Sequence, residues 1–556
     1  MASIKSFNTR LEALKSERSS FIPEWREMSD YILAGRGRFL ADDNNKGGRR
    51  NLKQINNKPK MSARTLASGM MSGITSPSRP WFQLGTGDTE LNEFDSVKTW
   101  LHKVQQIMYS VYSASNTYNS LHNVYSELGV FGTATMGVYA DFENVIHCKT
   151  YTAGEYMIGT DGRDIVDTFY REYQLTVAQT VKQFGKDNVS SDVLDRWNNG
   201  NTETWVDIVH AVEPNDDRDH MSPMAKDKKF RSVYYESATN LRNGKDKFLR
   251  ESGFDDFPVL GPRWGVAASD IYGTDWPGMD AIGDVKALQL GEKRKYQGVD
   301  QVVLPPMQGP SAMVSKIQQG GLNPGDMIAN DHATQGMRSI YDTRPDLSAI
   351  GQINMDAENR ISHAFYEDLF MMLANSDRRQ ITATEVAEKQ EEKLLMLGPV
   401  LERLHSELLD PLINRTFNIL QKAGVLPPPP PELEGRELQV EYVSVLAQAQ
   451  RMVAVTGIER TVGFAAEMSQ IWPEARLKVD AMQVMDDYAV SMGVNPKIIK
   501  SDERVGQEQA AEAQQQQAAV QQQQSAEAVN MAKTASEIDT NGENGLTDMM
   551  QRAGLA

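Results

Sequence analysis

Cysteine, long apolar runs and positive charge are all scarce in this chain. Its one cysteine, Cys148, excludes a disulfide within the chain, and a thiolate metal site would need ligands of other kinds. No run of about 18 or more apolar residues occurs, so no membrane-spanning helix is expected. Residues 1–10 are polar and lack the apolar core of a secretion signal. We therefore expect a protein that folds in a reducing cytoplasm and has no membrane partner.

Acidic residues outnumber basic ones, with 75 Asp and Glu against 58 Lys and Arg, for a formal net charge of -17. A protein that coats DNA is normally basic, because its affinity comes from neutralising phosphates and releasing counterions. The acidic balance argues against tight wrapping of nucleic acid. It still permits DNA to pass close by without sticking.

The motifs of common enzymes are missing. No Gly-x-x-x-x-Gly-Lys-Ser/Thr phosphate loop is present, which argues against ATP-driven movement by this chain itself. The segment 69–73 is not a nucleophile elbow, because Ser72 stands one place late. Its small residues favour close helix packing instead. We expect neither an enzymatic activity nor a cofactor.

Two groupings of reactive side chains have plain structural explanations. His210 and His220 flank four acidic residues, which could in principle bind a divalent metal, but a solvated acidic turn is the favoured interpretation. Cys148 follows His147. Neighbouring residues on a strand point to opposite faces, so we expect Cys148 to be a packing residue and predict no metal site.

The 556 residues are too many for one compact core, so several domains are expected. The first 40 residues show the three- and four-residue spacing of a buried helix face, and residues 96–128 indicate a helix pair. From Gly129 to about Ile271 the pattern becomes that of strands, beginning with Val130 and Phe131, with a helix over 177–184. This combination predicts an α+β fold, mainly helical overall, with a mostly antiparallel sheet.

The region 280–373 is predicted to be two helices around an insertion. The first carries the basic run Lys293, Arg294 and Lys295 and ends at Gly298. Residues 299–345 are rich in proline and glycine, which predicts an irregular or small β insertion. The second helix, 346–373, carries an i, i+4 stripe of apolar residues.

A break at residues 375–380, which contains Arg378 and Arg379, precedes a long kinked helix over 382–424. Thr382 and Glu385 have the capping-box spacing, and Pro399 and Pro411 should kink the helix. At 1.5 Å per residue the helix would span roughly 60 Å, which is the length of a strut. A smaller helical domain follows, and beyond Asp502 the chain is a Gln/Ala-rich tail that is either disordered or an extended helix.

The basic residues 293–295 and the pair Arg378 and Arg379 each have two interpretations. As isolated clusters, such residues are most often solvated helix ends. The order helix, insertion, helix, loop and strut is unusual for a monomer, however, and it favours a role in contacting phosphates.

Three segments carry a resemblance to a known family: SARTLASGMMSGITSPSRPWF at 62–82, YGTDWPGMDAIGDVK at 272–286, and TATEVAEKQEEKLLMLGPVLE at 382–402, continuing to Leu409-Asp-Pro-Leu412. On these residues the sequence resembles the portal, or head-to-tail connector, proteins of short-tailed bacteriophages. The resemblance spans about residues 1–430, and the glutamine-rich tail lies outside it.

The resemblance implies a ring of twelve subunits at one capsid vertex of the virion, assembled in the host cytoplasm. Double-stranded DNA would enter and leave through its channel. The implied partners are the terminase large subunit, which supplies the ATP-driven motor, the tail adaptor or nozzle proteins, and the major capsid and scaffolding proteins. Twelve copies at -17 would total 12 × -17 = -204, which would repel DNA phosphates and let the duplex slide.

The family also implies a division of the chain. Residues 1–275 would form the wing, with the strut of 383–431 packed on it. Residues 276–298 and 346–373 would form the stem helices, with the clip, 299–345, between them. The tunnel loop would be 374–381, followed by the long kinked wing helix 382–431. The crown would be 432–502, and the tail 503–556 would be a helical barrel or a disordered segment.

Two surfaces follow as hypotheses. The DNA channel would be lined by Arg378, Arg379, Gln380, Asn375, Lys293, Arg294 and Lys295. The interface between subunits would involve Ile353, Ile361, Phe365 and Leu369. The basic residues 293–295 could instead pair with acidic groups of the next subunit. A capsid or scaffolding-type assembly protein without a channel, and a nucleic-acid enzyme with an unrecognised site, are the competing interpretations.

Overall fold

The computed structural model describes residues 4–40, 51–86, 91, 94–237, 248–311, 325–330, 338–340, 346–375, 397–433, 438–442, 460–469, 472, 474, 478–492 and 502–537. The chain divides into two compact units. The larger comprises 1–84, 103–428 and 440–453, and the smaller comprises 85–102, 429–439 and 454–556.

The first 40 residues fold as two helices, α1 (Ile4–Arg18) and α2 (Ile22–Tyr31). Their predicted apolar face is buried, with Leu11 and Trp25 almost fully covered. A proline lies in the first turn of α2, where a missing amide hydrogen leaves no bond unmade. The chain therefore breaks just before that proline.

Helix α3 (Lys58–Ile74) packs closely on α6 (Thr117–Phe131). A Cβ atom at Gly129 would overlap Leu66, and one at Gly69 would overlap Phe370. The prediction that the small residues of this stretch permit close helix packing is confirmed. The chain then continues into β1 (Phe82–Thr86), and α5 (Asp95–Ala114) precedes α6, as the expected helix pair.

The prediction of strand structure at Val130 and Phe131 is wrong. Both residues belong to the last turn of α6, and both are completely buried. The helix ends one residue later at Gly132, whose φ of +73° suits a glycine at a helix end. Valine and phenylalanine favour strands, but this preference is weak, and packing against the rest of the fold determines the secondary structure here.

Two antiparallel sheets follow, with orders β3-β2-β9 and β4-β5-β6-β7-β8. The predicted α+β class and its mostly antiparallel sheet are thereby confirmed. The strands are β2 (Thr135–Asp141), β3 (Val145–Tyr151), β4 (Tyr156–Thr160), β5 (Val166–Thr176), β6 (Trp205–Pro214), β7 (Phe230–Glu236), β8 (Arg250–Phe254) and β9 (Val259–Leu260).

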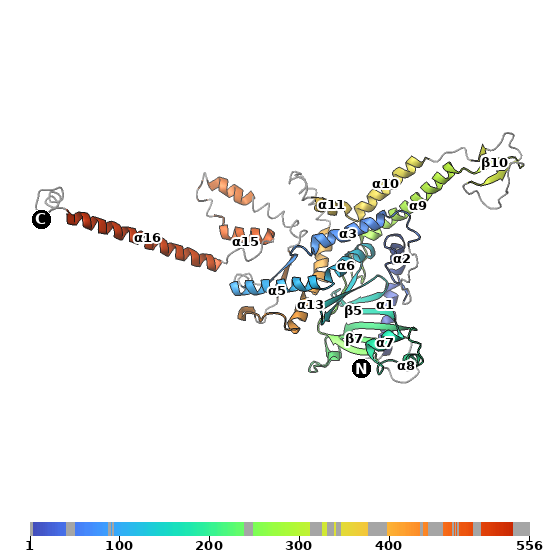
Figure 1. Cartoon of the computed structure of the whole chain (residues 1–556), viewed down its shortest axis with the longest axis horizontal. Coiled ribbons are helices and arrows are strands. Elements are labelled where there is room, and N and C mark those ends of the chain that lie inside the picture. Colours follow the sequence, from blue (N-terminus) through green and yellow to red (C-terminus); the bar gives the residue numbers. More distant parts are fainter. Residues whose placement is uncertain are drawn as a thin grey trace. The chain divides into compact units, whose positions relative to one another are not determined.

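The five-stranded sheet is covered on one face by α1 (Figure 1), whose Phe7 and Leu11 pack on Tyr170 and Val233. Helices α7 (Val177–Phe184) and α8 (Ser191–Asn198) cover part of the other face. The bounds of α7 match the prediction, because its first turn is closed by a complete capping box.

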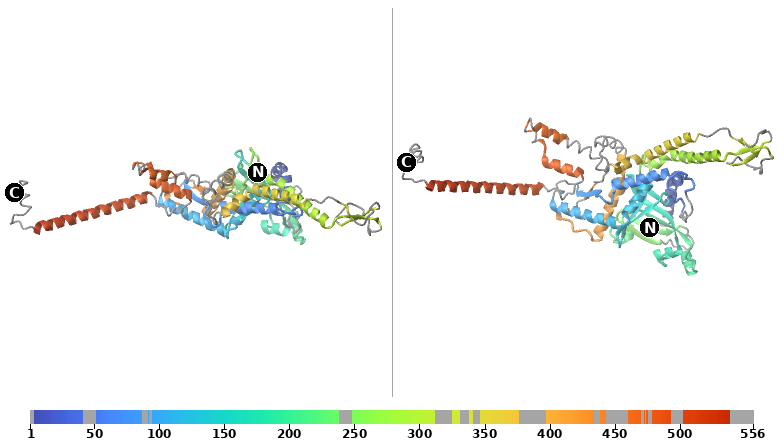
Figure 2. Two further views of the ribbon diagram at one scale, coloured as in Figure 1. Left: turned by 90° about the horizontal axis from the view of Figure 1, so that it is seen from above. Right: turned by 45° about the horizontal axis from the view of Figure 1, so that its top comes forward.

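Helices α9 (Pro277–Val303) and α10 (Leu347–Ala364) lie side by side and form a long hairpin, as Figures 1 and 2 show. The predicted end of α9 at Gly298 is wrong, because Gly298 lies buried inside the helix. Gly291 is the residue that permits close approach, since a Cβ atom there would overlap the Asn354 side chain.

A small sheet lies in the insertion between these helices. It consists of β10 (Met307–Gly309), β11 (Met327–Ala329) and β12 (Arg338–Ser339), in the order β11-β10-β12. The middle strand is parallel to β11 and antiparallel to β12. The prediction of a small β insertion is confirmed for the residues that the structure describes.

The second helix of the hairpin is interrupted. Asp346 caps α10 by accepting the amides of Ser348 and Ala349, but Phe365 and Tyr366 separate it from α11 (Glu367–Asn375). Tyr366 has a φ of +52°, which is rare outside glycine. The predicted continuous helix over 346–373 is therefore wrong, because the chain turns here to pack α11 on α3.

The strut helix is described from residue 397. It contains helical residues 397–404, a π-helical turn at His405–Leu409, and α13 (Asp410–Lys422). Pro411 cannot donate a backbone hydrogen bond and would clash with the carbonyl of residue 407 in a regular helix, which explains the π turn at this point. The capping box predicted at Thr382 and Glu385 lies outside the described residues.

The end of the strut agrees with prediction. Gly424 has a φ of +67°, and its amide donates to the carbonyl of Gln421, while the amide of Val425 donates to that of Leu420. These two bonds form a Schellman motif, which favours glycine at this position.

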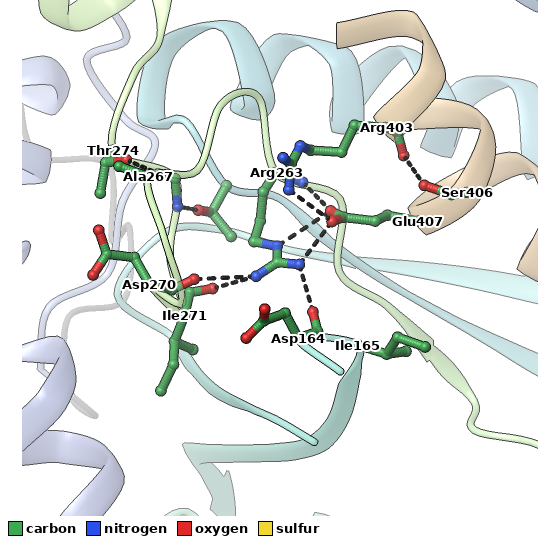
Figure 3. A network of polar contacts seen from close by, with 12 residues as sticks. Asp164, Ile165, Arg263, Ala267, Asp270, Ile271, Thr274, Arg403, Ser406 and Glu407 are labelled. Atoms are coloured by element: carbon green, nitrogen blue, oxygen red, sulfur yellow. Dashed lines mark hydrogen bonds and ion pairs between the residues drawn. The ribbon is translucent and has the colours of Figure 1, made fainter. Parts of the chain in front are cut away.

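One buried ion pair attaches the strut to the sheet domain (Figure 3). Arg263 is 2% exposed, and its Nη2 and Nε atoms donate to Glu407 in the π turn at 2.7 and 3.2 Å. The same guanidinium donates to the carbonyls of Asp164 at 2.7 Å and Asp270 at 3.2 Å. One side chain therefore joins three segments that are distant in sequence.

A second buried arginine fixes α13. The Arg415 Nε donates to the carbonyl of Val138 at 2.6 Å, and its Nη1 donates to that of Asp256 at 2.8 Å. Burial lowers the pKa of Arg415 to about 10, so the group stays charged near neutral pH. The strut is thus held at two points: Glu407 accepts hydrogen bonds from Arg263, and Arg415 donates to carbonyls of Val138 and Asp256.

The smaller unit contains a helix over 460–469, α15 (Ala481–Met492) and α16 (Asp502–Glu537). Of the two structures expected for the tail, the structure shows a helix, α16, which runs to Glu537. The strands β1 and β13 (Leu438–Tyr442) pair as a two-stranded sheet.

Replacing Glu407 by Ala should lower the free energy of unfolding by about 3–5 kcal/mol, because it leaves the buried Arg263 guanidinium without its carboxylate. The exposed Glu402 on the same helix supplies the control, and Glu402→Ala should change stability by less than about 0.5 kcal/mol. Urea unfolding followed by tryptophan fluorescence measures both. Equal effects of the two substitutions would show that the pair does not hold the strut.

Candidate functional site

The residues predicted to act on DNA are only partly described. Arg378, Arg379 and Gln380 lie outside the described residues, and Asn375 is the last residue of α11. Their predicted place along a channel therefore stays a prediction. The hairpin of α9 and α10 is the part of the predicted site whose geometry the structure describes.

The basic run of α9 does not lie at a helix end. Lys293 and Arg294 are exposed, and the helix continues beyond them to Val303. Lys295 lies 3.9 Å from Glu292 of its own helix, and Glu292 also accepts a hydrogen bond from Asn354 of α10 at 2.9 Å. Among the described residues, Lys295 therefore has a carboxylate neighbour, and Lys293 and Arg294 are exposed.

The apolar stripe of the second helix packs mainly inside the subunit. Ile361, Phe365 and Leu369 are fully buried, whereas Ile353 is 62% exposed. The periodicity correctly indicated a buried face. Helices α9 and α3 of the same chain cover most of that face. Of the four predicted interface residues, only Ile353 is exposed on the surface of this chain.

Apolar side chains that the sequence analysis missed lie exposed along the far part of the hairpin. Val302, Val303 and Leu304 are 51%, 69% and 58% exposed. A clustered apolar surface of this kind marks an interaction site. The valines after Gly298 are the sequence signal for this surface, but it becomes visible only when the helix is continued past the glycine to Val303.

The hairpin is fixed to the segment before α3 by a side chain that satisfies backbone groups. Gln289 accepts the amides of Ile55 and Asn56 at 2.7 and 2.8 Å and donates back to the carbonyl of Asn56 at 2.8 Å. Arg360 of α10 pairs with Asp284 of α9 at 2.7 Å. The two helices are therefore held to each other and to the segment before α3.

The start of α11 is tied to α3 in the same way. Lys58 and Ser62 both donate to Glu367 at 2.8 Å. Desolvation opposes ionisation of this carboxyl, but these hydrogen bonds hold the pKa of Glu367 below its ordinary value. The segment 376–381 thus follows a helix whose first turn is anchored.

The structure separates the two histidines that the sequence places near four acidic residues. His210 is buried in β6 and contacts the Ser232 hydroxyl at 3.1 Å, whereas His220 is exposed beside exposed acidic residues. Among the residues that the structure describes, no group of three or more His, Cys, Asp or Glu is arranged to hold a metal ion.

Cys148 is a packing residue, as predicted. It is buried in β3 while the preceding His147 is exposed. Burial raises the pKa of the Cys148 thiol to about 11, so the thiolate needed of a nucleophile is scarce at neutral pH.

The described helices include none with both the length and the apolar character needed to cross a lipid bilayer.

Comparison with known proteins agrees with the resemblance carried by the three sequence segments. The family model described as "Bacteriophage head to tail connecting protein" matches residues 5–499. The "Portal protein" of Salmonella phage epsilon15 is 43% identical over 550 residues, which cover 98% of this chain and 97% of that protein. The "Probable portal protein" of Bordetella phage BPP-1 is 43% identical over 543 residues, which cover 97% of each.

Ile361→Asp should destabilise the isolated subunit by more than about 4 kcal/mol, because it places an unpaired carboxylate among buried side chains. Ile353→Asp places the same charge in solvent on the same helix, so the unfolding free energy should change by less than about 0.5 kcal/mol. Urea unfolding of both variants tests this contrast. A stable Ile361→Asp subunit would mean that the buried stripe is not part of the subunit core.

Proposed function

The chain belongs to the family of bacteriophage head-to-tail connecting proteins, and from that membership we propose that it is the portal subunit of a short-tailed phage. The match over almost the whole chain to the portal protein of phage epsilon15 carries this conclusion. A portal protein joins the capsid to the tail and is a structural part of the virion. We accordingly assign it no catalytic activity and no cofactor.

The subunit assembles into a closed ring, for which the family suggests twelve copies. Ring closure needs a head-to-tail interface in which different surfaces of neighbouring subunits match. The exposed apolar residues of α9, together with Ile353 of α10, support a contact between neighbouring hairpins. The hairpin would then form the stem that surrounds the channel.

The remaining segments take their roles from the family. Residues 299–345, with the β10–β12 sheet, would form the clip that meets the terminase and then the tail adaptor. Residues 1–275 with the strut would form the wing, in contact with the capsid and scaffolding proteins. Residues 374–381 would be the tunnel loop, 432–502 the crown, and 503–556 the tail.

The charge of the chain suits a conduit for DNA. With a net charge of -17 per subunit, the ring would repel the duplex on average and let it slide. Arg378 and Arg379 at the tunnel loop, and the exposed Lys293 and Arg294 on the stem, would hold the DNA at fixed levels by contacting phosphates.

Ring assembly can be tested on α9. The double substitution Val302→Asp/Val303→Asp should leave the subunit folded but strongly reduce rings in negative-stain images and on size-exclusion chromatography, because it places like charges at the proposed contact. Met221→Asp changes an apolar residue that is 91% exposed in a loop, and rings should persist. Particles without a central hole in the unmodified protein would instead favour an assembly protein that forms no channel.

The tunnel-loop assignment can be tested with Arg378→Gln/Arg379→Gln. Rings should form normally, but heads assembled with the cognate terminase should retain several-fold less nuclease-protected DNA, because the retaining contacts are lost. The variant Lys5→Gln/Lys103→Gln removes two exposed charges of the larger unit and should package normally. Full DNA retention by the arginine variant would place the retaining contacts elsewhere.

A further inference from the structure

The five-stranded sheet carries a polar and aromatic row on the face opposite α1. The register pairs Tyr156, Arg171, His210, Tyr234 and Arg250 directly across β4 to β8. The neighbouring row packs on α1, so this row points to the other side of the sheet. Helices α7 and α8 cover only part of that side.

The uncovered part of this face borders a cavity of about 1140 Å³. Its walls include Arg171, His210 and Arg250 of the row, Lys149 and Tyr151 of β3, and the segment 35–40. Leu40 and Arg250 are also exposed, so the cavity opens to solvent. Its volume is sufficient for a small molecule with its hydration water.

The charge of the cavity is opposite to that of the chain. Seven lysine and arginine side chains line it, against two glutamates, although the whole chain carries -17. A concave site lined by charges of one sign focuses the electrostatic field and concentrates counter-ions. The cavity is therefore attractive to anions on a molecule that repels them elsewhere.

Arg171 is the most enclosed of these cations. Its side chain is 7% exposed and lies 3.8 Å from the centroid of the Tyr173 ring. Its ion pair with Glu155 is 3.8 Å long, which is too long for a hydrogen bond, and its Nε atom has no hydrogen-bond partner. A buried guanidinium with such weak pairing is costly without a further anion.

Two further cations line the cavity, Lys149 and Arg250. Burial, and then repulsion by Arg171 and Arg38, lower the pKa of Lys149 to about 8. Burial, and then repulsion by Arg171, Lys149 and Arg250, hold the pKa of His210 well below its ordinary range, so this residue adds no charge. At Lys149, therefore, repulsion by Arg171 and Arg38 acts against the attraction of Glu155, and the pKa stays lowered.

We propose that this cavity binds a small multivalent phosphate anion, with Arg171, Lys149 and Arg250 supplying the charge. A guanidinium offers two parallel donors and an ammonium a compact point charge, a combination that matches phosphate oxygens. The Tyr139 and Tyr151 hydroxyls, 3.0 Å apart, add neutral hydrogen-bonding groups at the same wall. The site does not depend on the ring or on DNA.

Calorimetric titration of the full-length protein with sodium pyrophosphate at constant ionic strength tests the proposal. Lys149→Gln and Arg250→Gln should each weaken binding about tenfold, which corresponds to the loss of one charge-assisted hydrogen bond. Both side chains are exposed in part, so both variants should keep the unfolding midpoint of the parent. Lys103→Gln, an exposed lysine of α5 that does not line the cavity, should bind with unchanged affinity.

Three results would overturn the proposal. The first is no pyrophosphate-dependent heat beyond that of sodium chloride at matched ionic strength. The second is binding that is equally strong in the parent and in the two cavity variants. The third is binding of citrate but not of pyrophosphate, which would assign the cavity to carboxylates, such as those of an acidic peptide.

Discussion

The ion pair between Arg263 and Glu407 is the contact on which the arrangement of the larger unit depends. It joins the turn at Asp164, the loop at Asp270 and the π turn of the strut through one guanidinium. Because a buried charge is stable only when its partner is in place, the three segments must be positioned together. Pro411 fits this arrangement, since the π turn that accommodates it also contains Glu407.

Much of the fold could be predicted because its signals are local. The capping box of α7 and the glycine that ends the strut are encoded within a few residues, and both were placed correctly. The errors at Phe131, Gly298 and Tyr366 share another cause. At each of these positions, packing against distant segments overrides the local preference of the residue.

The functional residues were harder to predict than the family. Three segments were sufficient for the family. The stripe through Ile361 was predicted at an interface between subunits, and most of it lies buried within the chain, because periodicity shows that a face is buried and not what buries it. The row through Arg171 and His210 could not be found at all. Its members come together only through strand register, and residues far apart in sequence give no local sign of their pairing.

The burial of Cys148 has a practical consequence. With a pKa of about 11 and almost no exposed surface, the only thiol in the sequence should not react with maleimide reagents while the protein is folded. A cysteine introduced at any exposed position would then be the single reactive thiol on each subunit. The natural chain is therefore already a suitable background for attaching fluorophores or spin labels and measuring distances between neighbouring copies.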